Sequence, residues 1–156
     1  MSVKIVCIGK TSDSYLKEGM NVYQKRLTKY GNIQWKELPD VPKKKFNSPT
    51  TLKYQEFLLF QKEFQPGDCV VGLDEKGGSY DSRSFAQFWN TLVTSNSNVI
   101  VLIGGAYGYH DELYTRMNSM ISLSKMTFSH QLVRLLFLEQ LYRAHTILRG
   151  EPYHND

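Results

Sequence analysis

Three stretches in the last third of the chain combine residue types that suit ligand binding. The apolar run Val99–Ile103 ends in the glycine-rich turn Gly104–Gly108, and a strand that ends in two glycines lets a ligand approach the bare main chain. A turn of small and hydroxyl residues follows at Leu123–Phe128, and the tail Glu151–His154 comes later. Together the two turns predict a pocket built mainly from main-chain groups, which would suit a nucleotide-like cofactor. Taken alone, Gly104–Gly108 is more often an ordinary tight turn.

The common nucleotide motifs are absent. A dinucleotide fold would place G-x-G-x-x-G after an early strand, but the first strand ends Ile8-Gly-Lys-Thr11. The sequence has no G-x-x-x-x-G-K-[ST] loop either. These absences argue against both of the common phosphate loops.

The spacing of the histidines argues against metal binding and favours a functional role for the histidine in the C-terminal tail. None of them shares a spacing that suits zinc and none has a cysteine nearby in sequence, so we expect no metal; they are His110, His130, His145 and His154. His154 follows Tyr153, and an aromatic–histidine pair can stack on a base and hydrogen-bond its edge. A frayed tail without function is the open alternative.

A long helix, Ser129–Leu148, is apolar on all sides, so both of its faces should be buried. One face would cover the sheet and the other would meet a second subunit, which predicts a homodimer. Glu139 and Arg143 are four residues apart and can pair on one face. For Arg134 and Arg143, an interface salt bridge and a contact to phosphate or base are both open.

Short apolar runs alternate with longer amphipathic ones, which predicts a single α/β domain over residues 1–156. We expect a mostly parallel sheet with helices on both faces, and loops at Pro39–Phe46 and Glu75–Ser79. Since ligands of open α/β sheets bind at the carboxyl ends of strands, Leu73-Asp74, Gly104-Gly105 and Leu123–Phe128 should lie together. The expected strands are Val3–Gly9, Ile33–Leu38, Cys69–Asp74, Val99–Gly104 and Ser119–Ser124, and the expected helices are Ser12–Tyr30, Ser48–Phe64, Ser82–Thr94, His110–Met117 and Ser129–Leu148.

Charge is unevenly distributed along the chain. Residues 1–63 carry 12 Lys and Arg against 6 Asp and Glu, whereas residues 64–156 carry 7 against 9. A basic first part would suit a polyanion, although a charge that merely confers solubility is an open alternative. Cys7 and Cys69 lie in apolar runs and should be buried thiols. We expect a cytoplasmic protein, because no signal peptide precedes the first strand and no apolar run could span a bilayer.

The blocks Ile103–Gly108 and Leu123–Gln131, with the ending Phe137–Ala144 and Gly150–His154, resemble the large-subunit ribosomal RNA methyltransferase H family. The resemblance extends over essentially the whole chain, including its length and the opening Lys4-Ile-Val. One departure is the ending Asn155-Asp156, where family members often carry a basic residue or a second histidine.

The resemblance implies a SPOUT-type fold whose C-terminal part forms a deep trefoil knot, an exception to the rule that connections do not thread loops. It also implies a homodimer that uses S-adenosylmethionine to methylate N3 of a pseudouridine in 23S ribosomal RNA. By the same resemblance, Tyr153 and His154 would complete the active site of the partner subunit. The implied cofactor contacts are Leu73, Gly104, Leu123, Ser124, Lys125, Met126, Thr127 and Phe128, with Gly105 and Gly108 as adjacent candidates.

This reaction gives the candidate catalytic residues distinct roles. His154 is expected to act as base or to contact the base edge, Arg143 to stabilise an anion or phosphate, and Tyr153 to stack. The basic first part, including Lys43–Lys45, would hold RNA phosphates in a salt-dependent way. Two other classes stay open: a non-catalytic ribosome- or RNA-binding protein, and a flavodoxin-like nucleotide binder. Binding of S-adenosylmethionine distinguishes them.

Overall fold

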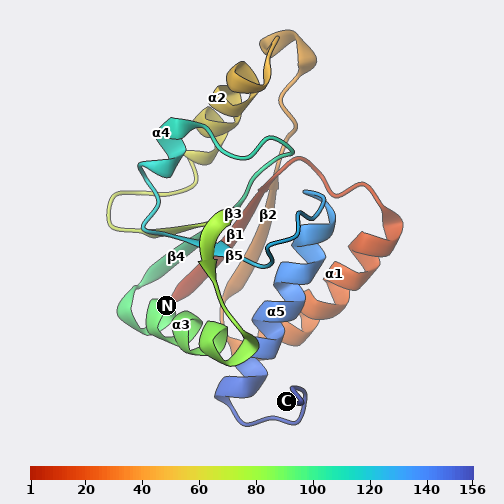
Figure 1. The fold of residues 1–156 in the computed structure, drawn as a ribbon, viewed down its shortest axis with the longest axis vertical. Coiled ribbons are helices and arrows are strands. Elements are labelled where there is room, and N and C mark those ends of the chain that lie inside the picture. Colours follow the sequence, from red (N-terminus) through yellow and green to blue (C-terminus); the bar gives the residue numbers. More distant parts are fainter.

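A five-stranded, all-parallel sheet forms the centre of the computed structural model, which describes residues 1–156 (Figure 1). The strand order is β2-β1-β4-β3-β5. The strands are β1 Ser2–Ile8, β2 Ile33–Leu38, β3 Cys69–Ser79, β4 Asn98–Ile103 and β5 Ser119–Ser122. The expected α/β class and parallel pairing are therefore confirmed.

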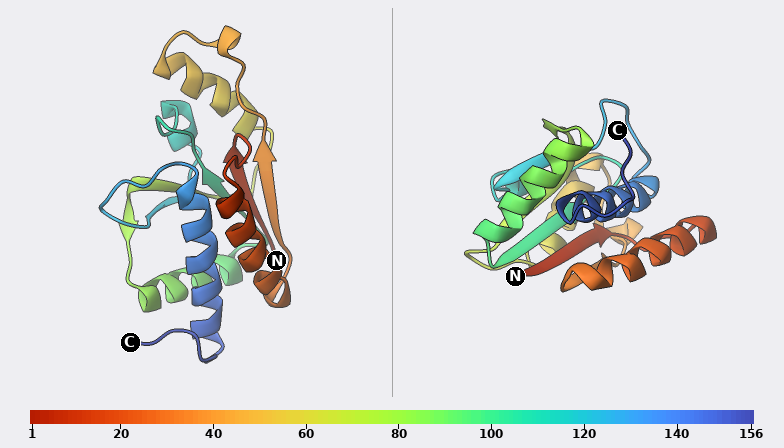
Figure 2. Two further views of the ribbon diagram at one scale, coloured as in Figure 1. Left: turned by 90° about the vertical axis from the view of Figure 1, so that its right-hand side faces the viewer. Right: turned by 90° about the horizontal axis from the view of Figure 1, so that it is seen from below.

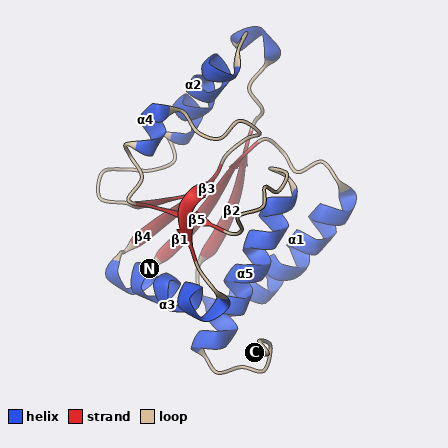
Figure 3. Cartoon of the chain, viewed as in Figure 1, coloured by secondary structure: helices blue, strands red, loops and turns tan.

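Helices cover both faces of the sheet, because successive strand residues point to opposite sides. Val3, Ile5 and Cys7 of β1 face one core with α1, α3 and α5. Val6 and Ile8 face a second, smaller core with α2 and α4. Figure 3 shows the two helical layers, and Figure 2 shows α5 lying between α1 and α3. The helices are α1 Ser14–Leu27, α2 Pro49–Phe60, α3 Ser82–Ser95, α4 Asp111–Tyr114 and α5 Leu132–Leu148, with short 3₁₀ helices at Thr28–Tyr30 and Lys43–Lys45.

The prediction of a loop at Glu75–Ser79 was wrong, because these residues continue β3. The register of β3 against β5 shifts after Leu73, and pairing resumes at Gly78 and Ser79. A Cβ atom on Gly77 would lie 2.6 Å from the main chain of Ile121. The glycine that reads as a turn signal therefore permits two strands to approach closely.

Helix starts differ from the expected ones by a few residues. Ser48 caps α2 with its side chain as expected, whereas Asp81 rather than Ser82 caps α3. Residues 129–131 precede α5 instead of forming its first turn, although the Ser129 hydroxyl accepts a hydrogen bond from the amide of Leu132 (3.0 Å). None of the helices is long and apolar enough to cross a membrane.

Arg134 is the largest departure from the sequence-based interpretation. Its side chain is wholly buried and donates to the carbonyl of Gly9 (2.8 Å), the hydroxyl of Thr11 (2.9 Å) and the carboxylate of Glu37 (3.2 Å). Arg134 therefore fastens α5 to the ends of β1 and β2 within this chain, and its buried guanidinium is not accessible to a partner subunit or to RNA.

Candidate cofactor and active site

A cavity of about 360 Å³ opens at the carboxyl ends of β4 and β5 and beside the register shift of β3 after Leu73, and these three strands are neighbours in the sheet. Nine of the ten candidate cofactor residues line it, and Lys125 does not. The nine are Leu73, Gly104, Gly105, Gly108, Leu123, Ser124, Met126, Thr127 and Phe128. The structure thus brings together three segments that are distant in sequence.

Tyr109 fixes the ends of β3 and β4 against each other. Its hydroxyl donates to the carbonyl of Leu102 (2.6 Å) and lies 3.0 Å from the carbonyl of Leu73. A Cβ atom on Gly104 would lie 3.0 Å from the Tyr109 ring, so a side chain at 104 would displace the residue that closes the cavity floor. Gly108 has a φ of +78°, a conformation that favours glycine.

The segment Leu123–Phe128 forms the outer wall and is held by few contacts. The amide of Met126 donates to the Ser124 hydroxyl (2.9 Å), and the Thr127 hydroxyl donates to the carboxylate of Glu75 (3.2 Å). The Met126 side chain is 78% exposed. The wall is therefore held through two hydroxyl residues, while most of the Met126 side chain is exposed.

Several side chains in the lining were not among the candidates. Asp74 and Glu75 follow the regular part of β3, and Tyr114 donates a 2.5 Å hydrogen bond to the carboxylate of Asp74. Burial, followed by the hydrogen bond to Asp74, raises the pKa of Tyr114 to about 12. The position of Asp74 at the end of an apolar run was the sequence signal that could have identified it as a lining residue. Tyr107 and His130 also line the cavity, and no sequence pattern singled them out.

The residues present fit a nucleoside-type cofactor. The volume lies within the range of small-molecule sites, and Leu73, Ile103 and Leu123 supply apolar walls for an aromatic base. Asp74 and Glu75 bring carboxylate oxygens, which can accept hydrogen bonds from ribose hydroxyls or face a cation.

Arg143, Tyr153 and His154 form a second group, which we call the tail cluster. The Arg143 guanidinium pairs with Glu139 (2.5 Å) as the spacing indicated, and it lies 4.8 Å from the centre of the Tyr153 ring. His154 Nδ1 lies 3.2 Å from the Arg143 guanidinium, and its Nε2 lies 2.9 Å from Asp156. The Tyr153 hydroxyl donates to Glu139 (3.0 Å).

The tail therefore folds back on α5, and the alternative of a frayed tail is wrong for this region. The hydrogen bond to Glu139 raises the pKa of Arg143 above its ordinary value, so Arg143 keeps its positive charge at neutral pH. None of the three tail-cluster residues lines the cavity.

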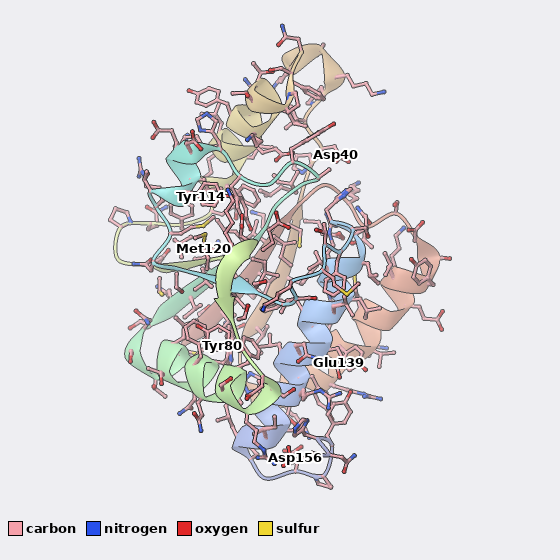
Figure 4. All side chains as sticks on the ribbon, viewed as in Figure 1. Asp40, Tyr80, Tyr114, Met120, Glu139 and Asp156 are labelled. Carbon is pink, nitrogen blue, oxygen red and sulfur yellow. The ribbon has the colours of Figure 1, made fainter.

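Distance along α5 separates the tail cluster from the cavity. Val133 lines the cavity at the start of the helix, and Arg143 follows ten residues later. At 1.5 Å per residue the two lie about 15 Å apart. In Figure 4, Tyr114 at the cavity and Glu139 and Asp156 at the tail cluster lie in different parts of the molecule.

Potential metal ligands do not gather anywhere in the structure: no three His, Cys, Asp or Glu residues are placed to hold an ion. Cys7 and Cys69 are buried free thiols, as the sequence predicted.

Comparison with known proteins assigns a class to this geometry. Residues 1–154 match the profile of a family described as "Predicted SPOUT methyltransferase". That match defines the class as a SPOUT methyltransferase, for which S-adenosylmethionine is the implied methyl donor.

Full-length relatives narrow the class further. The "Ribosomal RNA large subunit methyltransferase H" of Cytophaga hutchinsonii is 47% identical over 99% of this chain and 100% of its own length. Proteins of the same name from Christiangramia forsetii and Parabacteroides distasonis are 45% and 41% identical, covering 99% and 100% of this chain and 99% and 100% of their own lengths. The chain belongs to the large-subunit ribosomal RNA methyltransferase H family, as its sequence motifs had indicated.

Proposed function

We propose that this protein methylates N3 of a pseudouridine in 23S ribosomal RNA of the large ribosomal subunit, with S-adenosylmethionine as donor. The observation that carries the proposal is the cavity formed by three adjacent strands, lined by nine of the candidate cofactor residues in a chain of this family. A ribosomal RNA substrate supports a cytoplasmic location, which is part of the proposal. We treat residues 1–156 as one domain, since both cores share one sheet.

When bound, S-adenosylmethionine supplies an electrophilic methyl group on a positively charged sulfur. The task of the protein is to align an acceptor nitrogen with that methyl group. The cavity would hold the nucleoside part with its apolar walls and main-chain groups, and Asp74 would accept from the ribose hydroxyls. The N3 position of a pseudouridine carries a proton, so the site must also remove that proton.

The tail cluster would act on the RNA base. Tyr153 presents an aromatic ring for stacking, His154 can contact the base edge or accept its proton, and Arg143 can stabilise the negative charge that develops. Because the cluster lies about 15 Å along α5 from the cavity of its own chain, it would serve a cavity in a second copy. We therefore propose a homodimer in which each tail completes the site of the partner.

We also propose that the chain forms a trefoil knot in its C-terminal part. Support comes from the path of the chain: β5 lies at the sheet edge beside β3, whereas α5 lies in the middle of a face between α1 and α3 (Figure 2). The segment that returns the chain between these places, residues 123–131, includes the outer cavity wall. A knot in this segment would hold the outer wall of the cavity in place against the rest of the fold.

RNA phosphates would contact the basic first part of the chain. Lys43–Lys45 are exposed on a 3₁₀ helix before α2. Such contacts hold RNA without reading its sequence, and binding should weaken as salt rises. An affinity insensitive to salt would contradict this part of the proposal.

Two measurements test the proposed function. Calorimetry should detect S-adenosylmethionine binding to the purified protein, and ribosomes from a strain that lacks the enzyme should gain one methyl group on a pseudouridine, read by mass spectrometry of the nucleosides. Ribosome binding without cofactor binding would favour the non-catalytic alternative. A methyl group found on a different nucleoside would contradict the proposed pseudouridine substrate.

A further inference from the structure

Four cations lie on tyrosine rings where α1, the 3₁₀ helix after it and the end of α5 meet the C-terminal tail. Figure 1 shows α1 and α5 side by side, with the tail turning back beside the last turn of α5. Each cation lies 4.8–5.5 Å from the centre of its ring. The contacts, which together form what we call the cationic surface, join Arg26 to Tyr23 and Tyr142, Lys29 and Arg149 to Tyr30, and Arg143 to Tyr153.

The tyrosine rings join the cationic surface to the tail cluster. Tyr142 lies at the centre, because its ring is 5.9 Å from the Tyr23 ring and 6.0 Å from the Tyr30 ring, centre to centre. The Tyr142 ring also lies 4.8 Å from the ring of Tyr153. The hydroxyls of Tyr23 and Tyr153 are 3.2 Å apart. The cationic surface is therefore one packed unit with Tyr153, the residue that the proposed function assigns to the RNA base.

Two of the four cations have no carboxylate partner. Lys29 and Arg143 each pair with a carboxylate, at 2.8 Å and 2.5 Å. No carboxylate lies within ion-pair distance of Arg26 or Arg149, and both of these side chains are exposed. Arg26 and Arg149 therefore present unpaired positive charge to the solvent beside the tail cluster.

The hydrogen-bond donors of these two guanidinium groups are also free. The arginine side chains that donate hydrogen bonds within the chain are Arg83, Arg134 and Arg143, so the N–H groups of Arg26 and Arg149 have no acceptor. A guanidinium over an aromatic ring is held by its face, and its N–H groups point outward along its edge. Because the ring already restricts the side chain, less conformational entropy is lost when a ligand binds. Each group can therefore donate a pair of hydrogen bonds to an anion such as a phosphate.

A polyanion fits the cationic surface better than a second copy of the chain does. A symmetric dimer interface centred here would bring the same patch of two subunits together, so cations would face cations. RNA instead carries a negative charge on each phosphate and neutralises them. The tyrosine rings between the cations can also stack on bases. A strand whose target base reaches Tyr153 would pass over the adjoining cations.

We propose that Arg26 and Arg149 bind the phosphates of the ribosomal RNA that flank the target nucleotide. The inference rests on the proposed function, and it names the surface by which the RNA reaches the site. Contacts to phosphate carry no sequence information, but they fix the position of the strand on the protein. The cationic surface thus holds the RNA while the adjoining tail cluster contacts the base.

The variants Arg26→Gln and Arg149→Gln test the proposal through the salt dependence of binding. Ribosomes from a strain that lacks the enzyme are titrated with each protein over a series of potassium chloride concentrations at constant magnesium. Each variant loses one phosphate contact, so the slope of log affinity against log salt should become shallower by about 0.7–0.9. The Kd for S-adenosylmethionine should not change, because neither residue lines the cavity. In the methylation assay, KM for ribosomes should rise by about tenfold while kcat stays within about twofold, as expected for a contact made equally in the ground and transition states.

Two further variants serve as controls. Arg116→Gln removes an exposed arginine that follows α4, which packs in the core on the other face of the sheet, so it should keep the wild-type slope. Arg26→Lys keeps the charge but loses the paired donors, so it should keep the slope and bind more weakly than the wild type. A role of Arg26 in packing alone predicts no change of slope in any of these proteins. If Arg26→Gln does not fold, Arg149→Gln at the exposed end of α5 carries the same test.

The outcomes distinguish this proposal from the proposed function. Wild-type slopes in Arg26→Gln and Arg149→Gln would overturn the role of the cationic surface and leave the methyl transfer intact. A weaker dimer in analytical ultracentrifugation, with the slope for ribosomes unchanged, would assign the surface to a second copy and overturn the proposal as well. A wild-type protein that binds ribosomes but transfers no methyl group would overturn the proposed function, whereas the slopes would still measure the phosphate contacts.

Discussion

The cofactor cavity and the tail cluster are built by different means. The cavity takes its walls from the middle of β3 and from the turns after β4 and β5, and part of its surface is main chain, glycine or small side chains. The tail cluster comes from one helix and the residues that follow it, and it consists of a network of charged and aromatic side chains around Glu139. The two sites differ because a sheet holds the cavity, whereas a single helix holds the tail cluster.

The sheet and the helix are therefore suited to different parts of the proposed reaction. A parallel sheet brings distant segments to one edge, so it can shape a pocket for a cofactor. A helix instead holds side chains three and four residues apart, so it can arrange groups that act on a base. Since α5 touches both regions at opposite ends, the proposed homodimer would complete each site with the tail cluster of the second copy.

Arg134 provides the strongest test, because it fastens the helix that connects the two regions. Replacing it with Met would leave the carbonyls of Ile8 and Gly9 without their buried donor and would remove the cation that faces Glu37, which keeps its hydrogen bonds from Thr11. We expect a loss of about 3–5 kcal/mol in the free energy of unfolding, measured by urea titration at a fixed protein concentration. Arg149→Met, at the exposed end of α5, is the control and should cost less than about 1 kcal/mol. Equal losses would contradict the anchoring role.

His145 tests the tail end of α5 through pH. It stacks on Tyr30 at 4.8 Å, and burial lowers its pKa to about 4. The folded state therefore favours the neutral ring, so this contribution is complete above pH 6.5 and is lost as pH falls toward 4. Relative to His145→Phe, the wild type should lose up to about 3 kcal/mol over that range. Parallel stability curves for the two proteins would refute the assignment.

His154→Ala should separate binding from catalysis. We expect kcat for ribosomal RNA to fall by about 100-fold, because a base contact made in the transition state disappears. The Kd for S-adenosylmethionine should stay the same, since His154 does not line the cavity. A tenfold weaker cofactor affinity would show that the two regions are not separate.

Phe128 and Lys125 test the cavity wall itself. Both were candidate cofactor contacts, but only Phe128 lines the cavity. Phe128→Ala should weaken S-adenosylmethionine binding by about tenfold through lost apolar contact, while Lys125→Ala should leave it within about twofold, as expected for a residue outside the lining. Calorimetry on the two proteins compares their affinities for S-adenosylmethionine directly. A larger loss of affinity in Lys125→Ala than in Phe128→Ala would contradict the described wall.

Sequence alone predicted most of the sheet because strand runs such as Val99–Ile103 are short, apolar and bounded by turn residues. It could not predict the extension of β3, because Gly77 and Gly78 look like a turn and the close approach of β5 to Gly77 is visible only in the fold. The role of Arg134 was equally hidden, since its acceptors lie near the other end of the chain.

The most direct test of a site shared between two chains is complementation in mixed dimers. Gly104→Val would displace Tyr109 from the cavity lining and His154→Ala would remove the tail contact, so each homodimer should be nearly inactive. When the two proteins are unfolded together and refolded at equal amounts, half of the dimers are mixed and each has one intact site. The account predicts about one quarter of the wild-type methylation rate. A mixture no more active than its two parent proteins would contradict it.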